Sequence, residues 1–166
     1  MTSGLVIPPR SEPLVDLDLA AFLDLNNRHK VELSELDATE LARLVSIAFQ
    51  ARGTRNPMSM LLAYDQLADY ASPNFLWFKA RFERFVYIDR VVVSVDGRGL
   101  GLASRLYADL VEAACSVGHT RIVAEVNSDP PNPASDAFHA VRGFTEVGRA
   151  HLGDRGKTVR YLCQSL

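Results

Sequence analysis

The chain has 166 residues, 48% of them apolar and 23% charged, with a formal net charge of −2. These values are ordinary for a globular protein, and the length is most economically explained by one domain with a substantial core. The small charge argues against general binding to nucleic acid or an anionic membrane, and no apolar run reaches transmembrane length. Cys115 and Cys163 lack metal-ligand spacing, so we expect no metal site and two reduced core or near-core thiols in a cytoplasmic protein.

The N-terminal half carries few functional signals. Residues 1–13 contain three prolines and predict a loose leader, in which Leu5–Ile7 can add an edge strand, before a domain at 14–166. Two helices follow: one is capped by Asp16 or Asp18 and runs to about Asn27, and the other is capped by Asp37 and ended by Gly53.

A strand and an aromatic helix precede the centre of the chain. Met58–Tyr64 is an apolar run of strand length, and Ser72 with Pro73 predicts a helix start. The helix at 74–81 packs three aromatics into four residues, which is typical of a core. Because it lies directly before the central strand, Trp77 or Phe78 could instead line a binding pocket.

The most informative stretch runs from Phe85 into a helix that begins at Leu102. A β-branched strand at 85–95 leads into three alternate glycines, Gly97, Gly99 and Gly101. Glycines let a backbone approach an anion, and the first amides of the helix point toward it. A tight turn without a ligand needs only one glycine, so phosphate binding is the favoured interpretation.

The remaining elements predict a parallel neighbour strand, a helix and a hairpin. Gly118 closes the long helix, 121–127 forms the next strand, and Asn132 caps a helix that ends at Gly143. A hairpin then turns at 153–156. This order predicts an α/β (α+β) fold with a mixed central sheet flanked by helices.

A nicotinamide-dinucleotide fold is the weaker alternative. The glycine spacing is one residue short of that fingerprint, although Glu125 lies about where its ribose partner belongs. Only some forty residues follow Glu125, too few for the strand–helix units such a sheet still needs.

Two motifs resemble those of the GCN5-related N-acetyltransferase (GNAT) superfamily. Arg98-Gly-Leu-Gly101-Leu-Ala103 matches the acetyl-CoA-binding pattern Q/R-x-x-G-x-G/A. Asn132-Pro-Ala-Ser135-Asp-Ala-Phe138-His139-Ala-Val-Arg-Gly143-Phe144 is similar to the family's pattern N-x-x-S/A-x-x-ϕ-Y-x-x-x-G-F, in which ϕ is apolar. The resemblance covers roughly the last eighty residues.

The resemblance implies a single-domain GNAT-like fold in which two central parallel strands splay apart around acetyl-CoA. It implies transfer of the acetyl group to a primary amine of a small molecule or peptide, by direct attack in a ternary complex. A non-catalytic acyl-CoA-binding sensor is the alternative, and a homodimer is left open because homodimers are common among relatives.

The resemblance also assigns cofactor residues. Main-chain groups of Val91 and Val93 would pair with the pantetheine arm, and the amide of Val93 would face the thioester oxygen. The pyrophosphate would rest on the glycine loop, while the pantetheine and thiol regions would meet polar side chains. The loop residues are Arg98, Gly99, Leu100, Gly101, Leu102, Ala103 and Ser104, and the polar side chains are those of Asn127, Asn132, Ser135 and His139.

Three side chains are candidates for proton transfer. Glu125 and Asp89 place carboxylates inside apolar strands, which calls for a salt bridge or for a role as general base. His139 replaces the family's usual tyrosine and could hydrogen-bond the leaving thiolate, or be structural. The acceptor site is expected in the first half, where the loop at 26–34 is either one of its walls or a solvated connection. Its candidate residues are Asn27, Trp77, Phe78, Arg81 and Tyr87.

Overall fold

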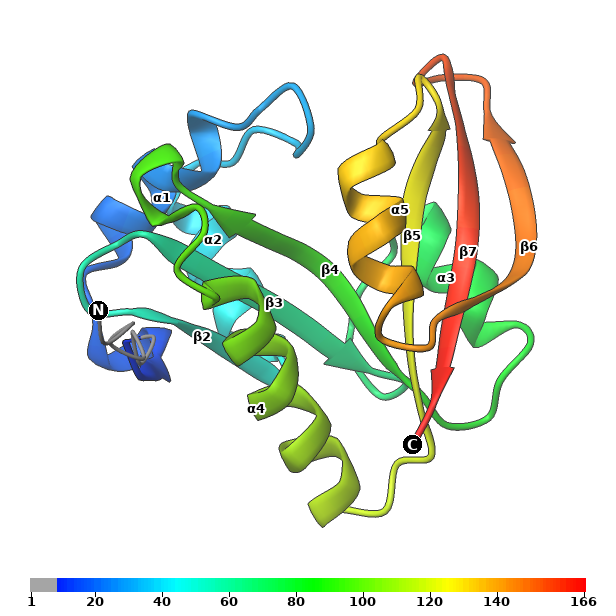
Figure 1. Ribbon diagram of the computed structural model, residues 1–166, viewed down its shortest axis with the longest axis horizontal. Coiled ribbons are helices and arrows are strands. Elements are labelled where there is room, and N and C mark those ends of the chain that lie inside the picture. The colour runs from blue at the N-terminus through cyan, green and yellow to red at the C-terminus, as the bar shows by residue number, and fades with distance from the viewer. Residues whose placement is uncertain (1–8) are drawn as a thin grey trace, which may run out of the picture. The chain divides into compact units, whose positions relative to one another are not determined.

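The computed structural model describes residues 9–166, whose strands join one seven-stranded mixed sheet in the order β1-β2-β3-β4-β5-β7-β6 (Figure 1). Helices flank this sheet, which confirms the predicted α/β class. The chain divides into two compact units, one of residues up to 64 with 89–113, the other of 65–88 with 114–166. Strand β4 (Val86–Val93) contributes residues to both. The predicted strand Leu5–Ile7 lies outside the described residues.

The first unit contains a three-stranded antiparallel part of the sheet. Register pairs Ser11 of β1 with Thr54 of β2, and Gln50 of β2 with Ala63 of β3. The end of the predicted leader is therefore an ordered edge strand. The elements are β1 (Ser11–Pro13), a 3-10 turn (Leu14–Asp16), α1 (Leu19–Asn27), α2 (Ala38–Ile47), β2 (Gln50–Thr54) and β3 (Ser59–Asp65), followed later by a 3-10 turn (Val95–Gly97) and most of α4 (Leu102–Ser116).

Both N-terminal helices start at the predicted caps. The Asp18 carboxylate accepts from the amide of Ala20, and that of Asp37 from the amide of Glu40. The predicted end of the second helix at Gly53 is wrong, because α2 stops at Ile47 and Gly53 lies inside β2. A Cβ at Gly53 would lie 2.6 Å from the ring of Phe22, so glycine here permits close packing.

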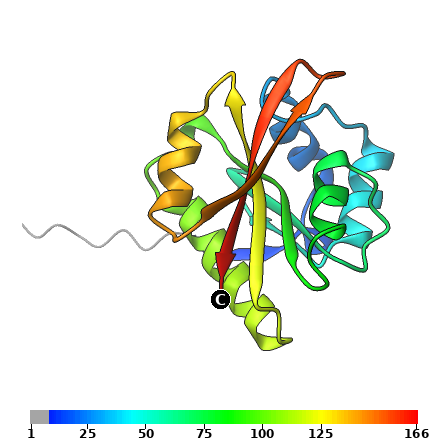
Figure 2. The same cartoon turned by 90° about the vertical axis from the view of Figure 1, so that its right-hand side faces the viewer.

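The second unit is a sheet with one helix on each face. Val86–Ile88 of β4 pair in parallel with Ile122–Ala124 of β5, as predicted, and β7 pairs antiparallel with both β5 and β6. Helix α3 covers one face and α5 the other (Figure 2). The elements are α3 (Pro73–Lys79), the start of β4, β5 (Arg121–Asp129), α5 (Pro133–Ala140), β6 (Thr145–Leu152) and β7 (Lys157–Ser165).

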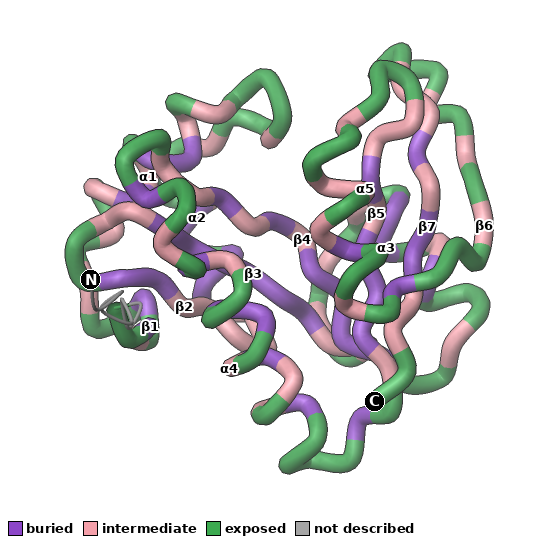
Figure 3. Tube along the Cα trace, in the orientation of Figure 1, coloured by how far each residue is buried: buried purple, intermediate pink, exposed green. Residues whose placement is uncertain are grey.

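The core of this unit is aromatic on the α3 face. Phe75, Phe78, Phe85 and Tyr87 are fully buried, and Tyr161 is 1% exposed. Figure 3 shows how burial differs between the strands of this unit, with buried stretches in β5 and β7 and mostly exposed residues in β6. The site side chains on this face therefore sit in a rigid setting.

Two local predictions need correction. Cys115 is exposed rather than near the core. Ser72 stands at the N-cap of α3, but its side chain makes no capping hydrogen bond. The predicted helix ends at Gly118 and Gly143 hold, with φ of 80° and 79°.

Candidate active site

The glycine loop joins β4 to α4 through glycines with two different roles. Gly97 is buried, and a Cβ there would lie 2.9 Å from Leu102 Cδ1 and 3.1 Å from Val93 Cγ1, so this glycine allows close packing. Gly99 and Gly101 have φ of 76° and 74°, which is left-handed backbone. These two glycines turn the chain into the helix.

The turn leads to the amides that begin α4. The first helical bond runs from the amide of Arg105 to the carbonyl of Gly101, at 3.0 Å. The amides of residues 102–104 precede that bond, and such groups at the positive end of a helix attract anions. Arg98, Gly99 and Ser104 are exposed. The loop therefore has the form of an anion cradle.

Glu125 is the centre of a hydrogen-bonded network on the α3 face. Its Oε1 accepts from Nδ2 of Asn74 and from the hydroxyl of Tyr87, each at 3.0 Å. The hydroxyl of Tyr161 in turn donates to Oδ1 of Asn74, at 3.0 Å. Burial, with the Glu125 carboxylate as a second cause, raises the pKa of Tyr161, so this phenol stays a donor.

Asn74 is a site residue that the sequence interpretation missed. It is 4% exposed and links α3 to both β5 and β7. The available signal was an asparagine in the first turn of a strongly apolar helix, where a buried amide needs partners.

His139 lies on the opposite, α5 face and is 5% exposed. Its Nδ1 is 2.8 Å from the carbonyl oxygen of Ser135, so Nδ1 carries a proton and the neutral ring has its acceptor at Nε2. Burial lowers the pKa of His139, outweighing the hydrogen bond to Ser135, and Arg142 lowers it further. The geometry favours a neutral imidazole.

Of the other predicted cofactor residues, Asn127, Asn132 and Ser135 belong to the second unit, and Val91 and Val93 to the first. Asn132 caps α5 through its oxygen, which accepts from the amide of Ser135, while its NH2 group stays a donor for other partners. Asn127 lies on the Glu125 face of β5, by the alternation of the strand. Val91 and Val93 are half-buried residues at the end of β4.

Asp89 belongs to an ion pair. Its Oδ2 lies 2.7 Å from Nε of Arg90, and the two side chains are only 6% and 5% exposed. This pair is the structural alternative that the sequence left open for Asp89. Oε1 of Glu125, in contrast, accepts from the side-chain amide of Asn74 and the hydroxyl of Tyr87.

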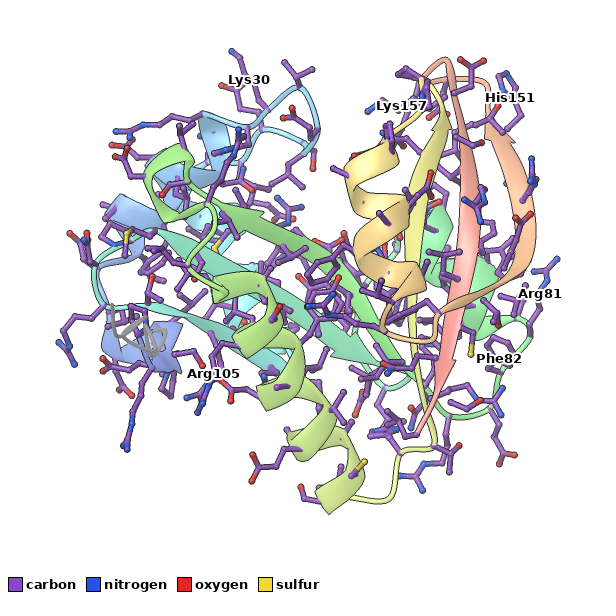
Figure 4. All side chains as sticks on the ribbon, viewed as in Figure 1. Lys30, Arg81, Phe82, Arg105, His151 and Lys157 are labelled. Atoms are coloured by element: carbon purple, nitrogen blue, oxygen red, sulfur yellow. The ribbon has the colours of Figure 1, made fainter. Side chains whose placement is uncertain are left out.

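The acceptor candidates fall into three settings. Phe78 and Tyr87 are fully buried, so their rings support the site from within. Trp77 is half-buried and stacks on Tyr161, with 4.1 Å between the ring centroids. The guanidinium of the exposed Arg81 (Figure 4) lies 3.9 Å from the centroid of the Trp77 ring. The side-chain amide of Asn27 bonds the backbone of Leu36 through both its atoms, at 2.9 and 3.0 Å.

Residues 9–166 show neither a metal-binding cluster nor a membrane-spanning helix. Residues 9–166 contain no group of three or more histidine, cysteine, aspartate or glutamate side chains arranged to hold a metal ion. In the same residues no helix has both the length and the apolar character that crossing a bilayer requires.

Comparison with solved structures shows the fold. NAA60 of Arabidopsis thaliana in complex with acetyl-CoA is 14% identical, with a TM-score of 0.69 and coverage of 94% of this chain and 97% of that one. A ribosomal-protein-alanine N-acetyltransferase from Brucella melitensis is 17% identical, with a TM-score of 0.68 and coverage of 90% and 94%. A chain of the NatC complex bound to Gag peptide and CoA is 18% identical, with a TM-score of 0.64 and coverage of 94% and 97%.

Comparison at the level of sequence gives the family. A search of curated proteins found no significant match. A model of the acetyltransferase (GNAT) family matches residues 21–144, which include the glycine loop, Glu125 and His139. The chain therefore belongs to the acetyltransferase (GNAT) family.

Proposed function

We propose that the protein is an acetyl-CoA-dependent N-acetyltransferase that moves an acetyl group to a primary amine by direct attack in a ternary complex. The observation that carries the proposal is the glycine loop, where left-handed Gly99 and Gly101 lead to the first amides of α4. Family membership and relatives of known fold that bind acetyl-CoA or CoA support acetyl-CoA as the co-substrate.

The cofactor is assigned to the predicted residues. Residues 98–104 hold the pyrophosphate, and the main chain of Val91 and Val93 pairs with the pantetheine arm, with the Val93 amide as the oxyanion donor. Asn132 donates through its NH2 group, since capping uses only its oxygen. Asn127 and Ser135 complete the set.

Glu125 is the proposed general base, acting on the amine directly or through water. Its Oε1 is oriented by bonds from the side-chain amide of Asn74 and the hydroxyl of Tyr87. Asp89, in contrast, is committed to Arg90. His139, whose pKa is lowered by burial, is assigned to the thiol region as a hydrogen-bond acceptor rather than an acid.

Direct attack is favoured over a cysteine-linked intermediate. Cys115 is exposed on α4, and burial raises the pKa of Cys163, which disfavours the thiolate needed for attack. Replacing both cysteines by serine is therefore expected to leave turnover intact.

A peptide N-terminus is the proposed first acceptor to test. One similar structure holds a Gag peptide, and another similar protein is named for ribosomal-protein alanine. Of the predicted acceptor residues, the exposed Arg81 offers a cation for an acidic side chain of such a peptide.

Thiol release from acetyl-CoA against pools of peptides and small amines tests the proposal. Turnover with at least one amine, lost on Glu125→Gln, is the expected result. Acetyl-CoA binding without thiol release across the whole panel would instead identify a non-catalytic acyl-CoA sensor.

A further inference from the structure

A cluster of buried polar side chains forms hydrogen bonds with the loop at 28–36, which lies between α1 and α2. Asn26 is fully buried, and the side chains of Arg90 and Asp89 are 5% and 6% exposed. We call Asn26, Asp89 and Arg90 the polar clamp. All three, and the loop, belong to the first unit.

Every nitrogen of the Arg90 guanidinium is used in the clamp. Nε donates to Asp89 at 2.7 Å, one terminal nitrogen donates to Oδ1 of Asn26 at 2.8 Å, and the other to Oγ of Ser34 at 3.3 Å. Asn26 also donates to the carbonyl of Ser34, at 3.1 Å. The far end of the loop is thus tied to both α1 and β4.

Further side-chain bonds join the two ends of the loop to each other and to α1. Asn27 pairs with both backbone groups of Leu36, and Asn26 donates to Oδ1 of Asn27 at 2.9 Å. Nδ1 of His29 lies 3.0 Å from the carbonyl of Leu25. The loop is therefore built as a fixed object.

The outer part of the loop has little packing of its own. Val31 is 83% exposed, and the side chain of Lys30 is also exposed (Figure 4), with its Nζ 4.0 Å from Oε1 of Glu35. Leu33 and Leu36 are only half-buried, so hydrophobic contact contributes little order, and the side-chain bonds of the clamp fix the loop to α1 and β4.

Burying the polar and charged side chains of the clamp costs free energy that a plain connection between two helices does not require. A buried arginine pair is often no more stabilising than apolar side chains of the same volume, so its benefit is a defined conformation. A solvated nine-residue connection needs no defined conformation, whereas a wall against which an amine is aligned does.

We propose that Arg90 is a positioning residue for the acceptor amine, because it fixes the loop at 28–36 to strand β4. This inference rests on the proposed function. Arg90 is one residue from Val91 and three from Val93, about 10 Å along an extended strand. The strand assigned to the acetyl donor thus also carries the anchor of the acceptor loop.

The kinetic test is Arg90→Met, which keeps an unbranched stem and removes all donors. The acceptor KM should rise about tenfold, while the KM for acetyl-CoA stays within about twofold. Arg90→Lys retains the charge beside Asp89 but not the fork, so the acceptor KM should stay raised. Arg43→Met, at an exposed pair with Glu40, is the matched control and should behave as wild type.

Limited trypsin digestion tests the clamp without turnover, because Arg28 and Lys30 are trypsin sites within the loop. Arg90→Met should be cut there at least tenfold faster than wild type or Arg43→Met, with fragments identified by mass. Ser34→Ala, at an exposed position, gives the same readouts in milder form if Arg90→Met does not fold.

The outcomes separate the two proposals. An unchanged acceptor KM, or an unchanged cutting rate, in Arg90→Met would overturn the positioning role. Equal rises in the KM values of both substrates would do the same, since they indicate general damage. No thiol release by the wild type would remove the proposed function and this role with it, while digestion would still report whether the clamp orders the loop.

Discussion

At the scale of single residues, the two strand carboxylates differ in what partners them. Asp89 meets a guanidinium, whereas the bonds to Oε1 of Glu125 come from an amide and a phenol. The ion pair holds Asp89 against Arg90, while the amide and the phenol fix the direction of Oε1 of Glu125. We therefore assign the Asp89 carboxylate to structure and propose the Glu125 carboxylate for proton transfer.

Glu125→Gln should lower kcat by about 10²–10⁴-fold, the usual contribution of a general base. Glutamine keeps an oxygen that accepts from Asn74 and Tyr87, so the network and the fold should survive, but it cannot take a proton at neutral pH. Steady-state thiol release gives kcat, and calorimetry should find acetyl-CoA affinity unchanged. Glu83→Gln, at an exposed residue before β4, is the control. Wild-type kcat in Glu125→Gln would contradict the assignment.

At the scale of elements, local chemistry made some boundaries predictable. Asp18, Asp37 and Asn132 cap helices, and Gly118 and Gly143 end them, because each acts through backbone groups a few residues away. The glycine loop was recognised for the same reason.

Elements decided by distant contacts were not predictable. The apolar spacing of α2 runs on through Ala48 and Phe49, directly before β2, so the local pattern gives no sign of a strand. Pairing of β2 with β1 and β3, and the packing of Gly53 against Phe22, make this segment a strand. The role of Asn74 depends likewise on β5 and β7, which follow it by some fifty residues or more. The carboxylates were found as candidates, but their partners required the structure.

Gly99→Ala tests the cradle against a matched glycine. Both Gly99 and Gly118 have left-handed backbone, and a Cβ at either meets no atom closer than 3.9 Å, so alanine should cost each about 1–2 kcal/mol of stability. Only Gly99→Ala should weaken acetyl-CoA binding, by about tenfold, because it redirects the amides of the loop. Equal affinities for the two variants, measured by calorimetry, would remove the cradle from binding.

The contact of α3 with β6 depends on another glycine. A Cβ on Gly148 would lie 2.7 Å from Cη2 of Trp77 and closer still to Cζ2, so Gly148→Ala should destabilise the protein by about 1–3 kcal/mol. Urea unfolding followed by the fluorescence of the single tryptophan measures this. Gly153→Ala, with its nearest atom 4.0 Å away, is the control.

A double variant shows whether overpacking is the cause. Gly148→Ala with Trp77→Phe should be less destabilised than the sum of the single changes, because the smaller ring makes room. Unfolding of all four proteins is followed by far-UV circular dichroism here, because Trp77→Phe removes the single tryptophan. Simple additivity would point instead to the backbone of β6.

At the scale of the whole molecule, two buried histidines link stability to pH. Burial lowers the pKa of both His119 and His139, with Arg84 and Arg142 as further causes. The unfolded chain, whose histidines titrate near 6.5, then binds more protons than the folded one just below that pH. The free energy of unfolding should therefore be highest above pH 6.5 and fall as the pH drops through that value.

Urea unfolding between about pH 5 and pH 8 measures this slope, in a range above the ordinary titration of carboxylates. His139→Phe should reduce the slope and His119→Gln should reduce it again, since each removes one group that must stay neutral to remain buried. His151→Gln, at an exposed residue of β6, should leave the slope at its wild-type value. A slope that survives both buried-histidine replacements would mean that other groups carry the linkage. It would also withdraw support for a neutral His139 in the proposed function, because the same burial underlies both predictions.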